Sequence, residues 1–158
     1  WQYENFDHTG SAIGYRVIMP DLRAHGRSDA PHDPACYPPD ILADDGTALI
    51  RQLGLAEFDL GGYSLGGRTT ARMILRGVRP ARAVIAGMGL AGLVGTSGRA
   101  DHFRRILSNP GSFARGTPEW NAEAFLKTTG GDRQALLHVL STFTDTDRTA
   151  LRAIDMPV

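Results

Sequence analysis

A serine between two glycines is the residue of this chain best suited to chemistry. Residues 58–61 form a mostly apolar run, Gly62-Tyr63-Ser64-Leu65-Gly66 follows it, and a helix-like pattern begins at once. Gly-x-Ser-x-Gly in this setting indicates a nucleophile elbow, a sharp strand-to-helix turn that lifts a serine hydroxyl into a site. We therefore predict that Ser64 is a catalytic nucleophile.

The geometry of such a turn predicts a role for each flanking residue. Side chains at Gly62 and Gly66 are expected to collide with neighbouring backbone, and glycine also accepts the unusual dihedral angles that such turns contain. The amides of the first helical turn point toward the site, where the helix dipole adds a partial positive charge. The N–H of Leu65 is therefore expected to donate to a developing oxyanion.

The elements around this turn alternate between strands and helices. Short apolar runs predict buried strands, at residues 15–20, 56–61 and 83–88. Helical spacing predicts helices, at residues 42–53 and 65–76. Asp40 is expected to cap the first helix and Gly54 to end it. The alternation predicts an α/β fold with a mainly parallel sheet flanked by helices.

The pattern changes after about residue 89. Residues 89–100 are rich in glycine and are expected to be flexible. Four helical patterns then follow without a strand among them, at residues 101–107, 118–127, 132–142 and 147–154. They suggest a cap or lid over a substrate pocket, with additional packing helices as the equal alternative. The predicted division is into residues 1–90 (partial core), 91–150 (helical cap) and 151–158 (start of a returning core strand).

Composition excludes several classes of function. The 158 residues carry 17 basic and 17 acidic side chains, so nothing suggests a nucleic-acid or membrane partner. We expect a cytoplasmic protein, because there is no leader pattern, no long apolar run and only one cysteine, Cys36. The expected partner is a small-molecule substrate. The five histidines show no metal-ligand spacing. The stripe of Arg68, Arg72 and Arg76 is interpreted as a solvated helix face.

Two motifs together resemble the α/β-hydrolase superfamily. Residues 17–29, Val-Ile-Met-Pro-Asp-Leu-Arg-Ala-His-Gly-Arg-Ser-Asp, are similar to the strand and loop that precede the elbow in that family. The family commonly has Asp-x-x-Gly-x-Gly-x-Ser there, whereas this chain has Ala24 at the first glycine. Gly-Tyr-Ser-Leu-Gly-Gly follows at the family's spacing. The resemblance is to the serine-nucleophile branch, with its esterases, lactonases and haloperoxidase-like enzymes, and it implies no cofactor.

The resemblance also implies a catalytic triad in the order serine, acid, histidine. Ser64 matches the nucleophile, and the acid and the histidine are expected beyond Val158. The second oxyanion amide is expected before Trp1. Residues 1–158 are thus expected to be an internal fragment of a longer enzyme, inactive by itself and prone to aggregate. His102 and His138 follow Ser64 but lie in helical patterns, which makes them weaker candidates for the base.

The predicted function is that of a serine hydrolase, which cleaves a small carboxylic ester, lactone or related carbonyl substrate through an acyl-enzyme. The serine argues against relatives that use aspartate as the nucleophile, such as epoxide hydrolases and haloalkane dehalogenases. A non-catalytic ligand-binding relative of the same fold is one alternative. A nucleotide-binding α/β domain, with residues 61–67 around a phosphate, is another, although the chain lacks a P-loop ending.

Overall fold

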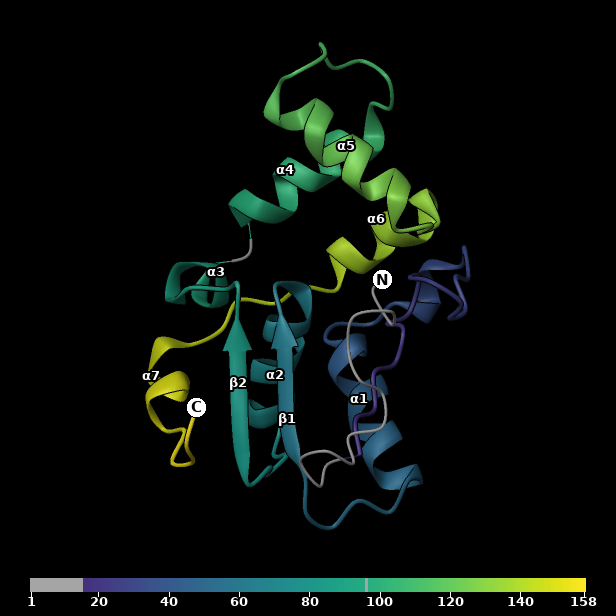
Figure 1. Cartoon of the computed structure of the whole chain (residues 1–158). Coiled ribbons are helices and arrows are strands. Elements are labelled where there is room, and N and C mark those ends of the chain that lie inside the picture. Colours follow the sequence, from purple (N-terminus) through teal and green to yellow (C-terminus); the bar gives the residue numbers. More distant parts are fainter. Residues whose placement is uncertain (1–15, 96) are drawn as a thin grey trace.

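In the part of the chain that the structure describes, a two-stranded parallel sheet with a helix on one face leads into the turn that carries Ser64. The computed structural model describes residues 16–95 and 97–158. Strand β1 (Asp59–Tyr63) pairs in parallel with β2 (Arg82–Ala86). Helix α2 (Leu65–Leu75) connects the two strands and packs on the sheet, and α1 (Ile41–Gln52) packs beside α2 (Figure 1). This arrangement confirms the predicted α/β class, and the short sheet agrees with an incomplete fold.

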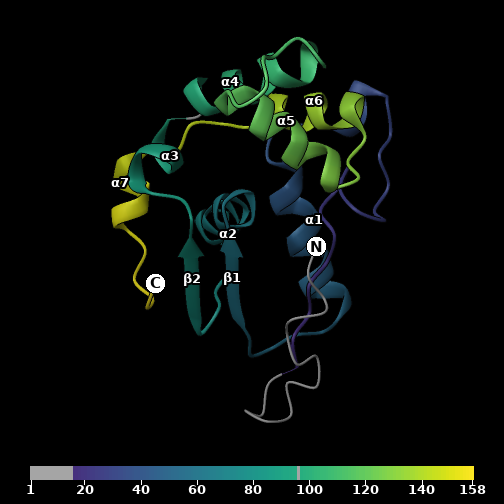
Figure 2. The same ribbon diagram turned by 45° about the horizontal axis from the view of Figure 1, so that its top comes forward.

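The remaining helices follow β2 in the chain. They are the short α3 (Leu90–Val94), α4 (Ser97–Ser108), α5 (Pro118–Thr128), α6 (Arg133–Ser141) and α7 (Arg148–Arg152). A short 3₁₀ turn, η1 (Pro34–Cys36), precedes α1. Helices α4, α5 and α6 lie beyond the carboxyl ends of the strands, whereas α7 lies beside β2 (Figures 1 and 2). The α4–α6 group is therefore at the end of the sheet where β1 turns into α2.

Local signals located several helix ends correctly. The carboxylates of Asp132 and Asp147 cap α6 and α7 by accepting backbone N–H groups, as their positions predict. Gly54 follows α1 with a left-handed φ of 61°, which the absence of a Cβ allows. Asp101 begins the helical pattern at residues 101–107 and, like Asp132 and Asp147, is a suitable helix start by residue type, but α4 begins four residues earlier, at Ser97.

The strand predicted at residues 15–20 is wrong for the residues that the structure describes. Residues 16–20 adopt no regular structure, and Val17, Ile18 and Met19 are exposed. Among the described residues the sheet contains only β1 and β2, so this segment has no strand beside it. A strand exists only through the ladder that satisfies its backbone groups, which explains why an apolar run alone does not form one. Tyr15 lies outside the described residues.

Three further segments differ from the predictions. Strand β1 covers Asp59–Tyr63 rather than residues 56–61. Residues 89–100 are largely helical rather than flexible, because α3 and the first turn of α4 fall there. Residues 153–158 form no strand, although the N–H of Ala83 in β2 donates to the carbonyl of Pro157 at 2.9 Å. The division into core and cap stays a prediction.

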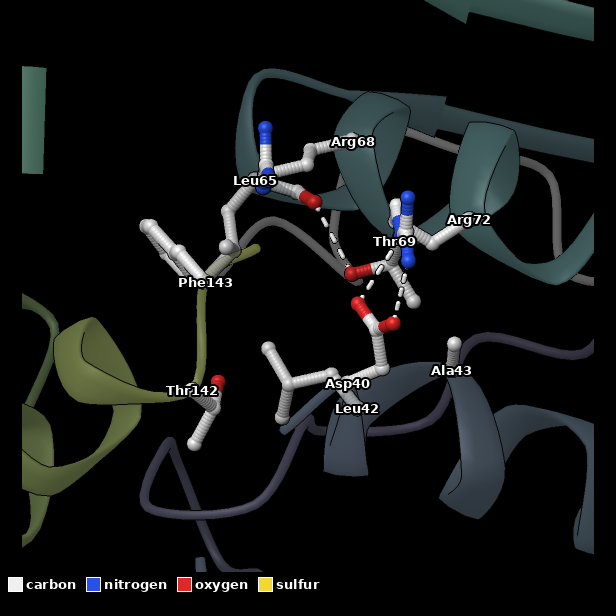
Figure 3. Close-up of a pocket in the computed structure, with 9 residues that line it drawn as sticks. All are labelled: Asp40, Leu42, Ala43, Leu65, Arg68, Thr69, Arg72, Thr142 and Phe143. Atoms are coloured by element: carbon white, nitrogen blue, oxygen red, sulfur yellow. Dashed lines mark hydrogen bonds and ion pairs between the residues drawn. The ribbon is translucent and has the colours of Figure 1, made fainter. Parts of the chain in front are cut away.

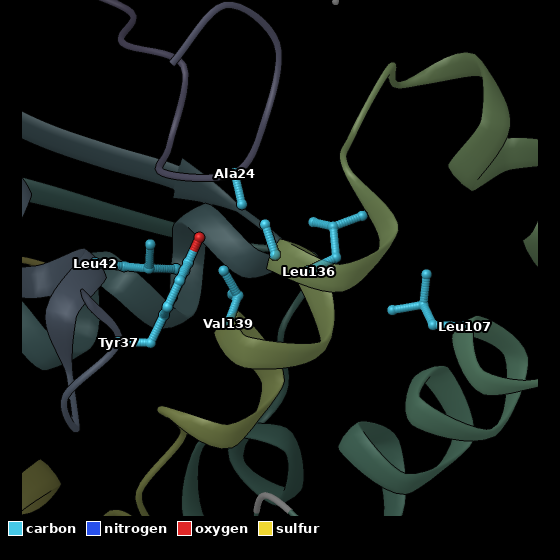
Figure 4. Close-up of a cluster of buried hydrophobic side chains, with 7 residues drawn as sticks. Ala24, Tyr37, Leu42, Leu107, Leu136 and Val139 are labelled. Atoms are coloured by element: carbon cyan, nitrogen blue, oxygen red, sulfur yellow. The ribbon is translucent and has the colours of Figure 1, made fainter. Parts of the chain in front are cut away.

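A buried apolar cluster attaches the α4–α6 group to the rest of the molecule. Its members come from the loop before α1 and from α1, α4 and α6: Ala24, Tyr37, Leu42, Leu107, Ala135, Leu136 and Val139 (Figure 4). The hydroxyl of Tyr37 donates to the carbonyl of Pro31 at 2.7 Å, which satisfies the one polar atom that this side chain brings into the cluster. The group therefore packs on the loop and α1 through apolar contacts.

Candidate active site

Ser64 occupies the turn between β1 and α2. Its backbone has φ 52° and ψ −113°, which few residues other than glycine adopt. The N–H of Ser64 donates to the carbonyl of Ala86 in β2 at 2.8 Å, and its carbonyl accepts the N–H of Arg68 at 3.0 Å. Both backbone groups of the serine are thus held by neighbouring elements. Such a conformation costs on the order of 1–3 kcal/mol and persists only where the surroundings impose it.

The two glycines of the motif have different structural roles. A Cβ on Gly62 would lie 2.1 Å from the carbonyl carbon of Gly66 and 2.6 Å from the nitrogen of Gly67, so the expected collision is confirmed there. A Cβ on Gly66 would meet nothing within 4 Å, so the same expectation is wrong for Gly66. The backbone of Gly66 is what a side chain at Gly62 would strike, whereas a side chain at Gly66 itself would have open space. The strained φ also falls on Ser64 and on neither glycine.

Gly67 is a second glycine that lies close to neighbouring backbone. Its Cβ would lie 3.0 Å from the carbonyl oxygen of Ala86 and 3.1 Å from that of Gly62. The close approach of α2 to the sheet therefore leaves little room for a side chain at Gly67, whereas Gly66 has open space.

Leu65 is the first residue of α2, so its N–H has no acceptor within the helix. The positive end of the helix dipole lies at the same position. This arrangement is compatible with the expected donation to an oxyanion, which stays a prediction.

The two histidines that follow Ser64 have other contacts. The Nε2 of His138 in α6 lies 3.1 Å from the carbonyl oxygen of His32, and its ring lies 5.2 Å from that of Tyr37. His102 in α4 makes an edge contact with Phe103. Within residues 16–95 and 97–158, no histidine is hydrogen-bonded to Ser64. A base for Ser64 is therefore not identified among these residues.

The loop within the family-like motif at residues 17–29 is closed around Asp21. The Asp21 carboxylate accepts the N–H of Arg27 at 3.0 Å, and its carbonyl accepts the Ser28 hydroxyl at 2.7 Å. Gly26 has φ 54°, and a Cβ there would lie 2.4 Å from the Asp21 carboxyl carbon. Ala24, where the family commonly has glycine, takes the glycine-like φ of 65° and is buried. Aspartate, glycine and serine at these positions thus close one turn.

The arginine stripe on α2 is not a solvated face. The Arg68 residue is only 5 % exposed, and the Arg72 guanidinium donates to the carboxylate of Asp40 from Nε at 2.8 Å and also from Nη2. Arg76 is more exposed and pairs with Asp44 at 2.6 Å. These residues face α1 and the segment after α6, and the helical spacing of the three arginines was the only sequence signal for them.

Asp40 precedes α1 as predicted but does not cap it with its side chain. It has φ 61° and makes no side-chain cap hydrogen bond, because its carboxylate binds Arg72 and accepts the Thr144 hydroxyl at 3.1 Å. Burial acts to raise the pKa of Asp40, but the hydrogen bond and charge of Arg72, with help from Thr144 and Arg76, hold the pKa below its ordinary value. Asp40 is therefore a structural anion between α1 and α2.

Ser64 does not line either of two hollows in the described part of the chain. A cavity of about 20 Å³ lies between α1, α2 and residues 142–143, with space for a single water (Figure 3). A wider, open hollow of about 370 Å³ follows residues 19–21 and 27–28. Within residues 16–95 and 97–158, no three His, Cys, Asp or Glu side chains are grouped so that they could hold a metal ion. No helix in these ranges has the length and apolar character needed to span a bilayer.

Comparisons with known proteins agree with this architecture. A family model described as the alpha/beta hydrolase fold matches residues 2–154. The chain therefore belongs to the α/β-hydrolase family.

Individual relatives carry several enzyme names. Epoxide hydrolase 2 of Siraitia grosvenorii is 41% identical over 56 residues, which are 35% of this chain and 18% of that protein. The sn-1-specific diacylglycerol lipase ABHD11 of Mus musculus is 38% identical over 77 residues, 46% of this chain and 24% of that protein. The crystal structure of bromoperoxidase from Bacillus anthracis is 25% identical with a TM-score of 0.56, and the match covers 92% of this chain and 62% of that one.

The chain therefore aligns with less than a quarter of the length of these two sequence relatives. Their enzyme names support an enzyme of this family without selecting one reaction.

Proposed function

We propose that the protein containing this chain is a serine hydrolase that cleaves a small carboxylic ester, lactone or related carbonyl substrate through an acyl-enzyme. One observation carries the proposal: Ser64 lies at a strained strand-to-helix turn, with φ 52° and ψ −113°, directly before the N-terminus of α2. A turn of this kind presents a serine hydroxyl outward beside unpaired helix amides.

The chemistry follows from these groups. The Ser64 oxygen attacks the carbonyl carbon, its proton passes through a base to the leaving alkoxide, and the bond to the leaving alcohol breaks. Water then cleaves the resulting ester, which releases the carboxylic acid and restores the hydroxyl. The N–H of Leu65 is placed in this proposal as one donor to the oxyanion. The base is a histidine, which the family order puts after the serine.

The identity of the nucleophile separates this reaction from epoxide opening, although epoxide hydrolases are among the relatives. A carboxylate that opens an epoxide forms an ester, which water can hydrolyse. A serine that opens an epoxide would form an ether, which is stable to hydrolysis and would leave the enzyme blocked. Ser64 therefore favours carbonyl substrates, and the lipase among the relatives agrees with that class.

A fluorophosphonate probe tests the proposal in the full-length protein. The probe is expected to modify Ser64, identified by mass spectrometry of the peptide that contains it, and Ser64→Ala is expected to abolish the label. Ser112→Ala is the matched control, because the Ser112 hydroxyl donates to a local carbonyl on an exposed turn. Equal labelling of wild type and Ser64→Ala would exclude Ser64 as the nucleophile. Ligand binding without labelling would instead support a non-catalytic relative.

A further inference from the structure

Arg68 joins two segments of the chain that are far apart in sequence. Its guanidinium donates to the carbonyls of Gly92 and Leu93 in α3, at 3.3 and 3.4 Å, and to the carbonyl of Thr144. The guanidinium carbon also lies 5.1 Å from the centre of the Phe143 ring, and Figure 3 shows Phe143 beside the Arg68 side chain. One buried side chain thus contacts both α3 and residues 143–144.

These two segments are the two connections of the α4–α6 group. The chain enters the group after α3 and leaves it through residues 142–146 (Figure 1). We use the word seam for the contacts that these two connections make with each other and with α1 and α2. The N–H of Thr146 donates to the carbonyl of Val94 at 3.2 Å, so the two connections also bind each other. The N–H of Asp40 donates to the carbonyl of Thr142 at 3.0 Å, which attaches the outgoing connection to the start of α1.

The chemistry of the seam requires a guanidinium rather than simply a positive charge. Three carbonyl oxygens from two segments surround Arg68, and a planar fork with five N–H donors can reach them together. An ammonium is a compact charge and cannot span the same separation. Burial lowers the pKa of Arg68, and the nearby charge of Arg72 lowers it further, while Asp40 and Asp145 oppose both effects. A guanidinium stays protonated in such surroundings because its pKa is far above neutral.

The same residue also contacts the proposed nucleophile through its backbone. The N–H of Arg68 donates to the carbonyl of Ser64 at 3.0 Å, which is the first hydrogen bond of α2. The side chain that joins both connections is therefore one helical turn from Ser64. The α4–α6 group lies at this end of the sheet (Figures 1 and 2).

We infer that Arg68 is a positioning residue, which fixes the α4–α6 group relative to Ser64 and thereby sets the size of acyl chain that the site accepts. This inference rests on the proposed function. It assigns a role in substrate selection to a residue that does not itself touch the reacting atoms.

The test uses Arg68→Met and Arg68→Lys in the full-length protein. Amide hydrogen exchange at Thr146 and Asp40 is expected to rise at least tenfold in both variants, while exchange in β1 stays unchanged. Fluorophosphonate labelling of Ser64 is expected to stay within threefold of wild type. For p-nitrophenyl esters from acetate to octanoate, KM for the preferred chain length is expected to rise about tenfold with kcat within threefold, so discrimination by chain length becomes weaker.

Arg105→Met is the matched control. The Arg105 guanidinium pairs with Glu119 inside the α4–α6 group, outside the seam, so exchange and selectivity are expected to match wild type. Wild-type exchange or an unchanged chain-length profile in Arg68→Lys would overturn the inference, and so would a parallel loss of labelling and of activity toward all the esters. Failure of the proposed function appears separately, as absence of Ser64 labelling in the wild-type protein, and the exchange measurement still tests the seam.

Discussion

Replacement of Gly62 by alanine is expected to move the serine that it positions. The added Cβ would lie 2.1 Å from the carbonyl carbon, and 2.2 Å from the carbonyl oxygen, of Gly66. Ordinary contact begins at about 3.4 Å, so the start of α2 must shift by roughly 1.3 Å relative to β1. The three nearest atoms all belong to backbone, so no side-chain rotation can relieve the contact.

The displacement sets the expected magnitudes. Overpacking a tight site usually costs 1–3 kcal/mol, and a purely backbone contact favours the upper end, about 3 kcal/mol. A shift of about 1 Å at a catalytic group lowers reactivity by roughly a hundredfold. Gly62→Ala is therefore expected to lose about 3 kcal/mol of unfolding free energy and about two orders of magnitude in the labelling rate of Ser64.

Gly66→Ala is the matched control, because the two glycines occupy equivalent places in the sequence motif. A Cβ at Gly66 meets nothing within 4 Å, and alanine in a helix is favoured over glycine by about 0.5–1 kcal/mol. Urea unfolding and fluorophosphonate labelling of the full-length protein measure both variants. Gly62→Ala with wild-type stability and labelling would refute the steric argument, and so would a Gly66→Ala variant as damaged as Gly62→Ala.

Two further predictions concern the contacts that hold the surrounding elements. Asp40→Asn is expected to lose about 3 kcal/mol at neutral pH, because Arg72 loses its buried counter-charge. Since the pKa of Asp40 is lowered on folding, its contribution is present above about pH 3.8 and is lost as the pH falls through the folded value, so the variant should show a flatter decline of stability with acid. Gly26→Ala is expected to lower the free energy of unfolding by about 2 kcal/mol, because φ is positive and the added Cβ would lie 2.4 Å from the carboxyl carbon of Asp21. Gly54→Ala also has a positive φ but open space around the Cβ, so it is expected to lose only about 1 kcal/mol.

Urea unfolding at several pH values measures these variants, with Asp44→Asn as the control for Asp40 because Asp44 is exposed and pairs with Arg76. Parallel acid profiles for wild type and Asp40→Asn would show that the ion pair does not contribute as argued. Equal losses in Gly26→Ala and Gly54→Ala would show that the backbone conformation alone, without the contact to Asp21, determines the cost.

Features that depend on a few adjacent residues could be predicted from the sequence. The apolar run, the serine between glycines and the helix after it together indicate the turn at Ser64, because strand, turn and helix are neighbours in the chain. Asp132 and Asp147 bind amides two or three residues away, so their capping is equally local. The family resemblance also depends on short motifs of adjacent residues, and the fold of that family indicates the α/β class.

Features that depend on distant segments could not be predicted in this way. The seam contacts of Arg68 join residues separated by 24 to 76 positions, so helical spacing alone cannot distinguish a buried arginine from a solvated one. The apolar run at residues 17–19 is exposed because backbone pairing, and not composition, makes a strand. The sequence by itself determined the order strand, turn, helix and strand from β1 to β2, and the residue at the turn. Tertiary structure decided which charges are buried and which glycine of the motif lies against neighbouring backbone, since both depend on atoms brought together only by folding.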